Sequence, residues 1–369
     1  MSAPSVTLIT HDLKGGGTQR VMVLLASGMA ERGVDVELIS IKGCDESVSG
    51  LSPAVKLRPL NASRCMKGMM PLIKHLRAVR SDVILSAPAH VNLMSVVARR
   101  VARCRIPLLV AEHSCPSYAS RHGARWHVRI AHTLARYLYR YAGAVVAVSN
   151  GVAEELASRC GLDRQRLHCI YNPVLPGDFD ELANRAVDHP WVTSMDKPIV
   201  LAVGRLEKVK NFTMLFQAFA LLREQCDARL VVLGEGRERY HLTETAEALG
   251  FSSDLYMPGY LSNPYPWMRS ASVLALTSES ESFGNVLIEA MACRTPVVTV
   301  DCPTGPREIL EAGRYGRLVP VDDVAAFAGA LYDAIRLPGD LEAARQRAME
   351  FTVERSVDQY AQVMGLDAK

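Results

Sequence analysis

Short apolar runs alternate with amphipathic helical patterns along the first 172 residues. The first run, Val6–Thr10, leads into a glycine-rich loop and then into a helical pattern that ends at Gly33. The other runs that we expect to form strands in this part are 34–41, 82–85, 108–112 and 144–148. Continuous apolar strands separated by helices are typical of a parallel sheet that is covered by helices on both faces.

The alternation stops after residue 172 and starts again at residue 198. The segment 173–197 is rich in proline and has no sheet period, so we interpret it as a connector with a short helix. Beyond it we expect a helix over 211–224 and strands over 198–203, 229–233, 273–276, 297–300 and 317–319. The pattern predicts two doubly wound α/β domains, 1–172 and 198–351, with a last helix at about 352–369 that packs back on the first domain.

Length and composition fit this prediction and exclude several classes of protein. A chain of 369 residues with 49% hydrophobic and 22% charged residues is long enough for two domains and too apolar to be disordered. No apolar run approaches the roughly 20 residues of a membrane-spanning helix, and the N-terminus lacks signal-peptide features. The nine cysteines include no C-x-x-C pair, which argues against a zinc cluster or a disulfide framework and favours a reduced, cytoplasmic setting.

The net charge of +3 conceals a strong asymmetry between the two halves. Residues 1–172 hold 23 basic and 11 acidic residues, whereas residues 173–369 hold 19 basic and 28 acidic residues. Within 60–140 there are 14 basic and 2 acidic residues. This asymmetry suggests that the first half faces an anionic surface or ligand.

Three glycines, Gly15, Gly16 and Gly17, follow the first predicted strand. Glycine lets the backbone approach a ligand, and the start of the next helix offers N–H groups to an anion. The spacing is not G-x-G-x-x-G, because Arg20 stands at the position of the last glycine, and this argues against a dinucleotide site. Taken alone, the glycines are equally consistent with a plain tight turn.

A basic loop follows the first strand of the second domain. In this loop, Arg205 and Lys210 can both face a phosphate, Arg205 through a bidentate fork and Lys210 as a point charge. A solvated basic loop is the ordinary alternative.

The segment 279–290 follows the strand 273–276 and contains Glu281 and Glu289. Carboxylates can accept hydrogen bonds from the vicinal hydroxyls of a sugar. The N–H groups of Phe283, Gly284 and Asn285 would face a phosphate at the helix start. A helix-dipole role is the alternative for Glu281, but Glu289 lies in an apolar stretch where an unpaired acid is costly.

Together these motifs resemble the retaining glycosyltransferases of family 4, with the GT-B fold of two Rossmann-like domains facing a cleft. The resemblance rests on E-x7-E (Glu281 to Glu289), R-x4-K (Arg205 to Lys210) and the early glycine loop, and it covers nearly the whole chain in order. The segment 301–313 resembles the branch that often uses UDP-linked hexoses or N-acetylhexosamines.

The resemblance implies roles for individual residues. Arg205 and Lys210 match the pair that holds the donor diphosphate, Glu289 the residue that binds the ribose, and Glu281 the residue that contacts the hexose. The glycine loop would lie near the diphosphate and the acceptor. His113, which directly follows the strand 108–112, resembles the active-site histidine of the family. A histidine satisfied within the core or a loop is the alternative, and the position at a strand end favours the active site.

The expected reaction moves a hexose or N-acetylhexosamine from a nucleotide sugar, with a UDP-sugar favoured, to a glycan or lipid-linked saccharide in cell-surface polysaccharide or glycoconjugate synthesis. Cations and helix N–H groups can neutralise the leaving diphosphate, so we expect no metal and no cofactor. The one D-x-D motif, Asp178–Asp180, lies in the connector, and we interpret it as a helix start or surface element. The resemblance implies front-face attack, with the departing phosphate helping to deprotonate the acceptor.

Three basic helical stretches in the first domain lead to a hypothesis about the acceptor. We expect this face to dock on anionic lipid at the inner face of the membrane and to take a lipid-linked acceptor. Solvated helix faces are the alternative, and nucleic acid is disfavoured because no aromatic-rich binding module accompanies the charge. The stretches are Arg64, Lys67, Lys74, Arg77 and Arg80; Arg99, Arg100, Arg103 and Arg105; and Arg121, Arg125, Arg129, Arg136 and Arg140.

Other functions remain as alternatives. Within the same fold these are a GDP-mannose-dependent mannosyltransferase and a non-hydrolysing UDP-sugar epimerase, which would need carboxylate acid/base pairs. A non-catalytic sugar-nucleotide or membrane scaffold is a second class, and a dinucleotide oxidoreductase is a third. The release of UDP only when an acceptor is present would separate transfer from epimerisation.

Overall fold

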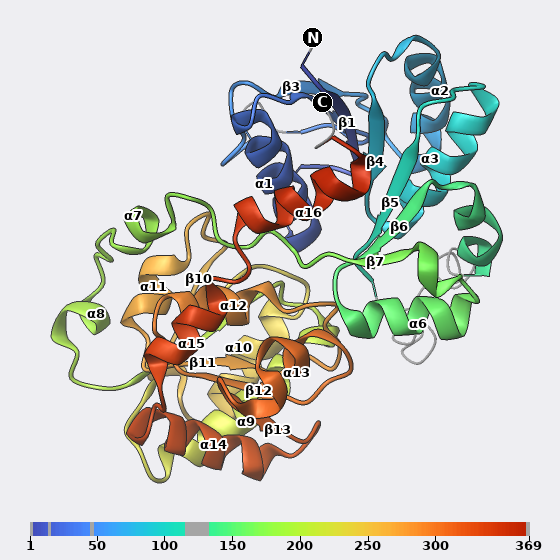
Figure 1. Ribbon diagram of the computed structural model, residues 1–369. Coiled ribbons are helices and arrows are strands. Elements are labelled where there is room, and N and C mark those ends of the chain that lie inside the picture. The colour runs from blue at the N-terminus through green and yellow to red at the C-terminus, as the bar shows by residue number, and fades with distance from the viewer. Residues whose placement is uncertain (1–2, 14–15, 45–47, 115–132, 367–369) are drawn as a thin grey trace. The chain divides into compact units, whose positions relative to one another are not determined.

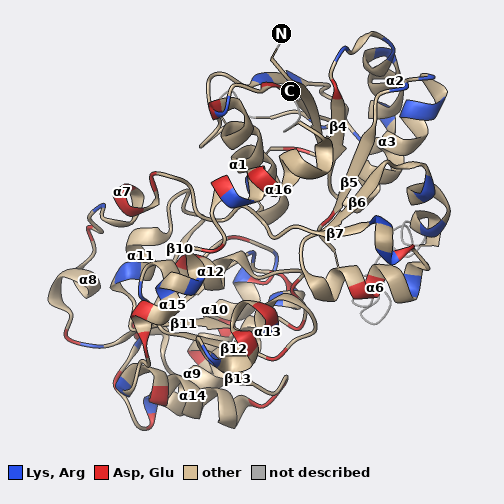
Figure 2. Cartoon of the chain, viewed as in Figure 1, with Lys and Arg blue, Asp and Glu red and all other residues tan. Residues whose placement is uncertain are grey.

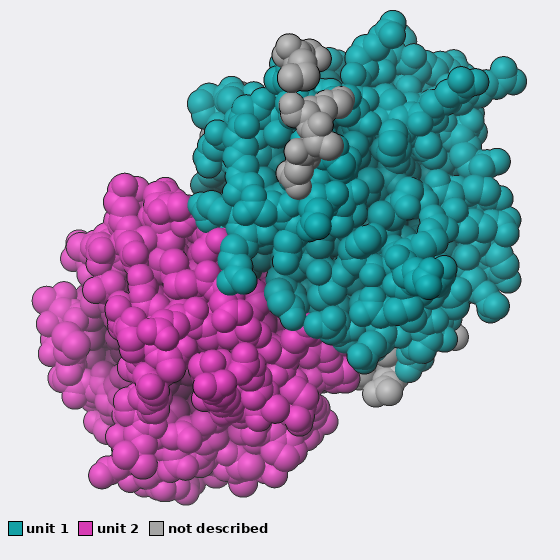
Figure 3. Space-filling model, in the orientation of Figure 1, with its two compact units in different colours: residues 1–174, 353–369 teal, residues 175–352 magenta. Residues whose placement is uncertain are grey.

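The computed structural model describes residues 3–13, 16–44, 48–114 and 133–366. The chain divides into two compact units, residues 1–174 with 353–369 and residues 175–352, which Figure 3 colours separately. Each unit is an α/β domain built on one parallel sheet (Figure 1). No helix in the described part of the chain is both long and apolar enough to cross a bilayer.

The first unit contains a seven-stranded sheet in the order β3-β2-β1-β4-β5-β6-β7, in which every neighbouring pair is parallel. Its strands are β1 (Ser5–Thr10), β2 (Asp35–Ser40), β3 (Lys56–Pro59), β4 (Val83–Ser86), β5 (Leu108–Glu112), β6 (Ala144–Ala147) and β7 (Leu167–Cys169). Among the described residues its α-helices are α1 (Gly17–Glu31), α2 (Met69–Ala78), α3 (Ala89–Val101), α6 (Asn150–Cys160) and α16 (Val353–Met364).

The last helix of the chain, α16, belongs to the first unit and packs on α1. Gly28 makes the close approach possible, because a Cβ atom there would lie 2.5 Å from Cγ1 of Val353 and 3.0 Å from Cγ2 of Val357. Arg32 at the end of α1 adds an ion pair with Asp358. The apolar face of α16 is therefore buried against this sheet domain.

The second unit contains a six-stranded parallel sheet in the order β10-β9-β8-β11-β12-β13. Its strands are β8 (Ile199–Val203), β9 (Arg229–Leu233), β10 (Leu255–Gly259), β11 (Val273–Leu276), β12 (Val297–Val300) and β13 (Arg317–Val319). Its helices are α7 (Phe179–Ala183), α8 (Pro190–Ser194), α9 (Phe212–Arg223), α10 (Arg239–Ala248), α11 (Tyr265–Ser270), α12 (Asn285–Ala292), α13 (Gly305–Ile309), α14 (Val324–Arg336) and α15 (Leu341–Ala348).

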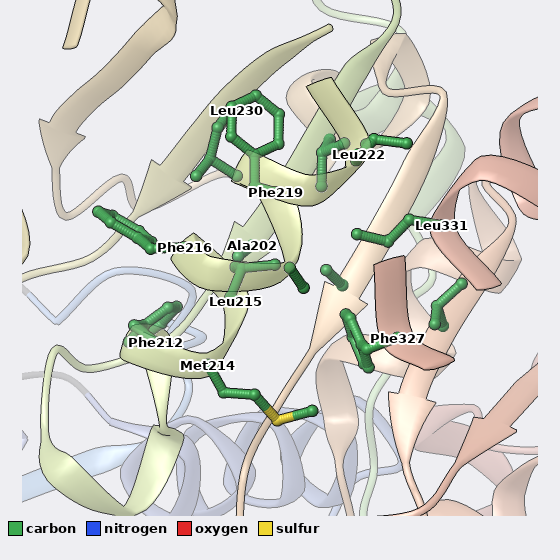
Figure 4. Packing of buried hydrophobic residues seen from close by; sticks show 14 of the residues in the cluster. Ala202, Phe212, Met214, Leu215, Phe216, Phe219, Leu222, Leu230, Phe327 and Leu331 are labelled. Atoms are coloured by element: carbon green, nitrogen blue, oxygen red, sulfur yellow. The ribbon is translucent and has the colours of Figure 1, made fainter. Parts of the chain in front are cut away.

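The core of the second unit lies under α9 and α14, whose apolar side chains meet over the sheet (Figure 4). Phe216 and Phe219 of α9 both contact the ring of Phe251, with centroids 5.5 Å and 5.0 Å away. The fully apolar β8 reads as a continuous hydrophobic run because helices cover both faces of a parallel sheet.

The predicted fold class, two doubly wound parallel-sheet domains, is confirmed. Three edge strands, β3, β7 and β10, were not predicted. The segment between residues 174 and 198 contains two short helices, α7 and α8, where the sequence predicted one.

Candidate functional site

The first strand of each unit lies inside its sheet, and the strand order reverses there. In the second unit β8 lies between β9 and β11, so the chain continues from β8 and from β11 in opposite directions across the sheet. Ligands of open α/β sheets bind at such a switch point, beyond the carboxyl ends of the strands. The predicted donor residues Arg205, Lys210 and Glu281 lie on these two loops.

Backbone and side-chain hydrogen bonds join the two loops. The N–H of Glu279 donates to the carbonyl of Val209 (2.9 Å), and the hydroxyl of Thr277 donates to the carbonyl of Lys210 (3.0 Å). An ion pair between Lys210 Nζ and Glu281 Oε1 completes the connection. Both side chains are largely buried, with 21% and 13% of their surfaces exposed, so this pair is held more firmly than a surface pair.

The positions of Lys210 and Arg205 follow from the local backbone. Lys210 ends a short 3-10 turn, and Asn211 then adopts a left-handed conformation (φ 47°) and caps α9 by accepting a hydrogen bond from the N–H of Met214 (3.3 Å). Asparagine tolerates this conformation better than most residues. Arg205 is exposed, and among the described residues its guanidinium forms no ion pair. The structure therefore joins Lys210 to Glu281 but does not join Arg205 to either of them.

A second glycine pair, which was not predicted from the sequence, supports this site. Gly234 and Gly236 follow β9, and their backbone packs directly on the loop after β8. A Cβ atom on Gly234 would lie 1.9 Å from the carbonyl oxygen of Gly204, and one on Gly236 would lie 2.2 Å from that of Leu206. The signal was present in the sequence as G-x-G directly after the strand 229–233.

Glycines also shape the acidic segment. Gly284 (φ 107°) is the N-cap of α12, which starts at Asn285. The buried Phe283 stacks edge-on against Phe351, with ring centroids 5.6 Å apart. Gly305 permits close packing here, because a Cβ atom on it would lie 1.8 Å from the carbonyl oxygen of Phe283. The start of α12 is thus fixed in place, and the positive end of its dipole lies at Gly284 and Asn285.

Glu289 lies within α12 and is only 6% exposed. One turn later, burial raises the pKa of the Cys293 thiol to about 12, and the charge of Glu289 adds to this effect. A buried carboxylate in an apolar helix is costly unless it serves a partner or a ligand.

The first unit has the corresponding switch point between β1 and β4. Gly15 lies outside the described residues. Gly16 (φ 126°) is the N-cap of α1 and Gly17 is the first residue of this helix. The glycine loop therefore leads into a helix start, as predicted.

His113 directly follows β5, and its ring nitrogen Nε2 is buried. Burial lowers the pKa of His113 to about 4. The imidazole is therefore neutral at pH 7 and can both donate and accept a hydrogen bond.

Two groups of residues carry side chains that can bind a metal ion. Asp178 precedes α7, and both carboxylate oxygens of Asp180 accept hydrogen bonds from Arg345 (3.0 and 3.1 Å), so the D-x-D motif starts a helix on the surface of the second unit. In the first unit, donor atoms of His11, Cys65 and His90 lie within 4.8 Å of one another. The two histidine nitrogens in this cluster hydrogen-bond to each other (2.9 Å).

Two family models match almost the whole chain. The model described as Glycosyltransferase Family 4 matches residues 15–176, and the model described as Glycosyl transferases group 1 matches residues 186–351. The chain belongs to glycosyltransferase family 4. This confirms the predicted family and the prediction that the protein is a transferase.

Two curated relatives span most of this glycosyltransferase. The N-acetylgalactosamine-N,N'-diacetylbacillosaminyl-diphospho-undecaprenol 4-alpha-N-acetylgalactosaminyltransferase of Campylobacter jejuni is 26% identical over 86% of this chain and 86% of its own length. The lipopolysaccharide core biosynthesis glycosyltransferase LpsE of Rhizobium meliloti is 29% identical over 87% of this chain and 86% of its own length.

Solved structures show the same fold. HepE of Anabaena, crystallised with UDP and glucose, has a TM-score of 0.77 over 99% of this chain and 100% of that chain, at 18% identity. The sucrose-phosphate synthase of Thermosynechococcus elongatus has a TM-score of 0.76 over 97% and 98%, at 20% identity. The glycosyltransferase has the GT-B fold, as predicted.

Proposed function

We propose that this glycosyltransferase transfers a hexose or N-acetylhexosamine, with retention of configuration, from a UDP-sugar to a glycan or lipid-linked saccharide. The observation that carries the proposal is the ion pair between Lys210 and Glu281, which joins the loops after β8 and β11 at the switch point of the second sheet. The relatives add support. The Campylobacter enzyme acts, by its name, on a diphospho-undecaprenol saccharide, and HepE was crystallised with UDP and glucose.

In this proposal the second unit neutralises the charge that develops on the departing diphosphate. Lys210 and Arg205 supply two positive charges, and the first N–H groups of α12 supply partial ones. Glu281 orients Lys210 and accepts hydrogen bonds from the donor hexose, while Glu289 accepts them from the ribose. These groups suffice without a metal ion at the diphosphate, and we expect turnover to survive chelation with EDTA.

The transfer step breaks the bond between the anomeric carbon and the phosphate oxygen of the donor. The acceptor oxygen forms its bond to this carbon on the same face, and its proton passes to the departing phosphate, which leaves as UDP. An α-linked donor therefore gives an α-linked product. Nuclear magnetic resonance of the product tests this, and an inverted anomeric configuration would contradict it.

A thermal-shift screen of UDP-, GDP- and ADP-sugars tests the donor, because a ligand of the native state raises the unfolding temperature. We expect the largest shift with a UDP-sugar. A GDP-sugar as the best ligand would instead favour a GDP-mannose-dependent mannosyltransferase.

A second measurement tests the reaction class. UDP release that depends on an added saccharide acceptor supports transfer, whereas interconversion of UDP-sugars without an acceptor would identify an epimerase. The matched pair Lys210→Ala and Lys208→Ala assigns the activity to the proposed site, because Lys208 is exposed in the same turn.

We also propose that the first unit docks on anionic lipid at the cytoplasmic leaflet. Figure 2 marks the basic residues around α2 in blue, and these cations are exposed, as are Met66 and Met70, with 74% and 67% of their surfaces accessible. We call this set the α2 patch: Arg64, Met66, Lys67, Met70, Lys74 and Arg77. Its four cations would contribute about 4 kcal/mol at an anionic surface. The α3 cations are used differently, since Arg99 donates to the carbonyl of Ile106 (2.6 Å) and Arg100 lies over the ring of Tyr141.

Flotation with phosphatidylcholine vesicles, with and without one third phosphatidylglycerol, tests this docking. We expect binding only to the anionic vesicles, and loss of binding in Lys67→Glu/Lys74→Glu. The variant Arg185→Glu/Arg314→Glu, on the second unit, makes the same charge change and should bind as the wild type does. Equal loss in both variants, or no binding by the wild type, would refute the hypothesis.

A further inference from the structure

A connected polar network is buried in the first unit, next to His113. Four side chains with at most 1% of their surface exposed make it up: Ser86 at the end of β4, Asn92 in α3, Glu112 at the end of β5, and Tyr139 in a 3-10 turn. The hydroxyl of Ser86 donates to Oδ1 of Asn92 (2.8 Å), and Nδ2 of Asn92 donates to the carbonyl of Ala111 (2.8 Å) and to the hydroxyl of Tyr139 (3.3 Å).

Glu112 is the centre of this network. Its Oε2 accepts a hydrogen bond from the hydroxyl of Tyr139 (2.8 Å), and its Oε1 accepts from the backbone N–H (3.2 Å) and the hydroxyl (2.5 Å) of Ser114. The carboxylate thus ties the first residues beyond the strand back to the strand itself. Asn92, in α3, also holds the end of the strand, because its side chain donates to the carbonyl of Ala111. All these contacts flank His113.

A network of this kind needs an explanation, because burying a carboxylate is unfavourable and an apolar cluster would hold the domain together equally well. The carboxylate of Glu112 shifts the pKa of two neighbouring side chains, Tyr139 and Cys160. Burial and the charge of Glu112 raise the pKa of Tyr139 well above its usual value, so its hydroxyl remains a donor. Burial together with the same carboxylate raises the pKa of Cys160 to about 11.

We propose that Glu112 and Tyr139 are positioning residues that fix the backbone from Ala111 to Ser114 and so hold the imidazole of His113 in place for the transfer reaction. The sheet ends at Glu112, so its hydrogen-bond ladder no longer fixes the residue that carries the imidazole. The carboxylate supplies a constraint beyond the end of the strand, through the N–H and the hydroxyl of Ser114. The catalytic part of this inference rests on the proposed transfer reaction and on the active-site role that the family resemblance implies for His113.

The test compares two tyrosines. Tyr139→Phe removes the donor to Glu112 and the longer contact from Asn92, whose Nδ2 keeps its hydrogen bond to Ala111. Tyr141→Phe is the matched control because its hydroxyl contacts Arg140, outside the network. We expect Tyr139→Phe to lower kcat by about 10- to 100-fold, because a misplacement of about 1 Å costs up to 100-fold. The KM for the UDP-sugar should stay within about twofold, and Tyr141→Phe should match the wild type.

A double-mutant cycle separates positioning of His113 from a general structural role. If Tyr139 acts through His113, the variant His113→Ala/Tyr139→Phe is no slower than His113→Ala alone. Losses that multiply, or an unchanged kcat in Tyr139→Phe, would overturn the proposal. Where Tyr139→Phe fails to fold, Ser114→Ala removes the hydroxyl contact to Glu112, keeps the contact of the backbone N–H, and should lower kcat by about 3- to 10-fold.

Hydrogen exchange keeps this inference separate from the proposed function. We expect the backbone amides of the peptide 108–114 to exchange at least about tenfold faster in Tyr139→Phe than in Tyr141→Phe. In Glu112→Gln, whose amide oxygen can still accept hydrogen bonds from Ser114, the exchange rate should stay near that of the wild type. Equal exchange in the two tyrosine variants overturns the positioning role whether or not the protein turns over a sugar nucleotide. Faster exchange with no turnover on any UDP-, GDP- or ADP-sugar would refute the proposed function and leave the structural role standing.

Discussion

Gly234 lets the loop after β9 touch the loop after β8 backbone to backbone, and we predict that Gly234→Ala forces them apart. The glycine has a φ of 146°, and a Cβ atom would lie 1.9 Å from the carbonyl oxygen of Gly204, where real contacts are at least 3.0 Å. The loop that carries Arg205 and Lys210 must therefore move by about 1.1 Å. The hydrogen bonds from Gly204 N–H to Leu233 and from Leu206 N–H to Glu235, both 2.9 Å, would stretch.

These contacts give the size of the effect. A strained backbone conformation costs about 1–3 kcal/mol, and a lost hydrogen bond costs about 1 kcal/mol. The free energy of unfolding should therefore fall by roughly 2–4 kcal/mol, which lowers the unfolding temperature by roughly 5–15 °C in a domain of this size. A displacement of about 1 Å at the donor site should also lower kcat/KM for the UDP-sugar about 100-fold.

Scanning calorimetry and steady-state kinetics, well below the unfolding temperature, measure the two effects. Gly329→Ala is the matched control, because no atom lies within 4 Å of the new Cβ on the exposed side of α14. That change should raise the free energy of unfolding by about 0.5–1 kcal/mol without altering turnover. Wild-type melting and kinetics in Gly234→Ala would show that the close packing of the two loops is not required.

Four further predictions address other parts of the molecule. Lys210→Ala should lower kcat by about 100- to 1,000-fold and Lys208→Ala by less than about threefold, because Lys210 forms the ion pair with Glu281 whereas Lys208 is exposed; similar losses in both would contradict the site. The pKa of His113 is about 4 in the folded protein and 6.5 in the unfolded chain, so the unfolded chain binds more protons between these pH values. Lowering the pH from 6.5 to 4 should therefore reduce the free energy of unfolding, measured by denaturant titration, by about 3 kcal/mol more in the wild type than in His113→Gln. Parallel curves for the two proteins would contradict a neutral imidazole in the folded state. Gly28→Val should destabilise the first unit by about 1–3 kcal/mol and expose α16 to proteolysis, because it collides with Val353; an unchanged digest would argue against this packing. Dialysis against EDTA should leave at least about 80% of the initial rate of a UDP-sugar reaction; inactivation reversed by Mg²⁺ or Mn²⁺ would refute metal independence.

The sequence was sufficient to predict the central strands because they are buried on both faces and read as apolar runs. The edge strand β3 was missed because three of its four residues are exposed and carry no apolar period. The edge strand β10 was missed because it contains Pro258 and a register shift between Tyr256 and Gly259. Edge strands are often short and irregular, which removes the pattern that identifies them.

The candidate site was predictable only where a motif was contiguous along the chain. Arg205, Lys210, Glu281 and Glu289 follow strands and could be read directly from the sequence. The contacts of Gly234 with Gly204 could not be read, since they depend on two loops brought together by the strand order. Glu112 and Tyr139 are 27 residues apart in the sequence. Their 2.8 Å hydrogen bond depends on the packing of β5 against the 3-10 turn Tyr139–Tyr141 in the core of the first unit.

A crystal of this glycosyltransferase soaked with UDP tests the central claim most directly. We predict that the diphosphate lies within hydrogen-bond reach of Lys210 and Arg205 at the start of α12, with the ribose on Glu289. A nucleotide bound elsewhere, for example at the glycine loop of the first unit, or a site that stays empty at saturating UDP, would contradict it.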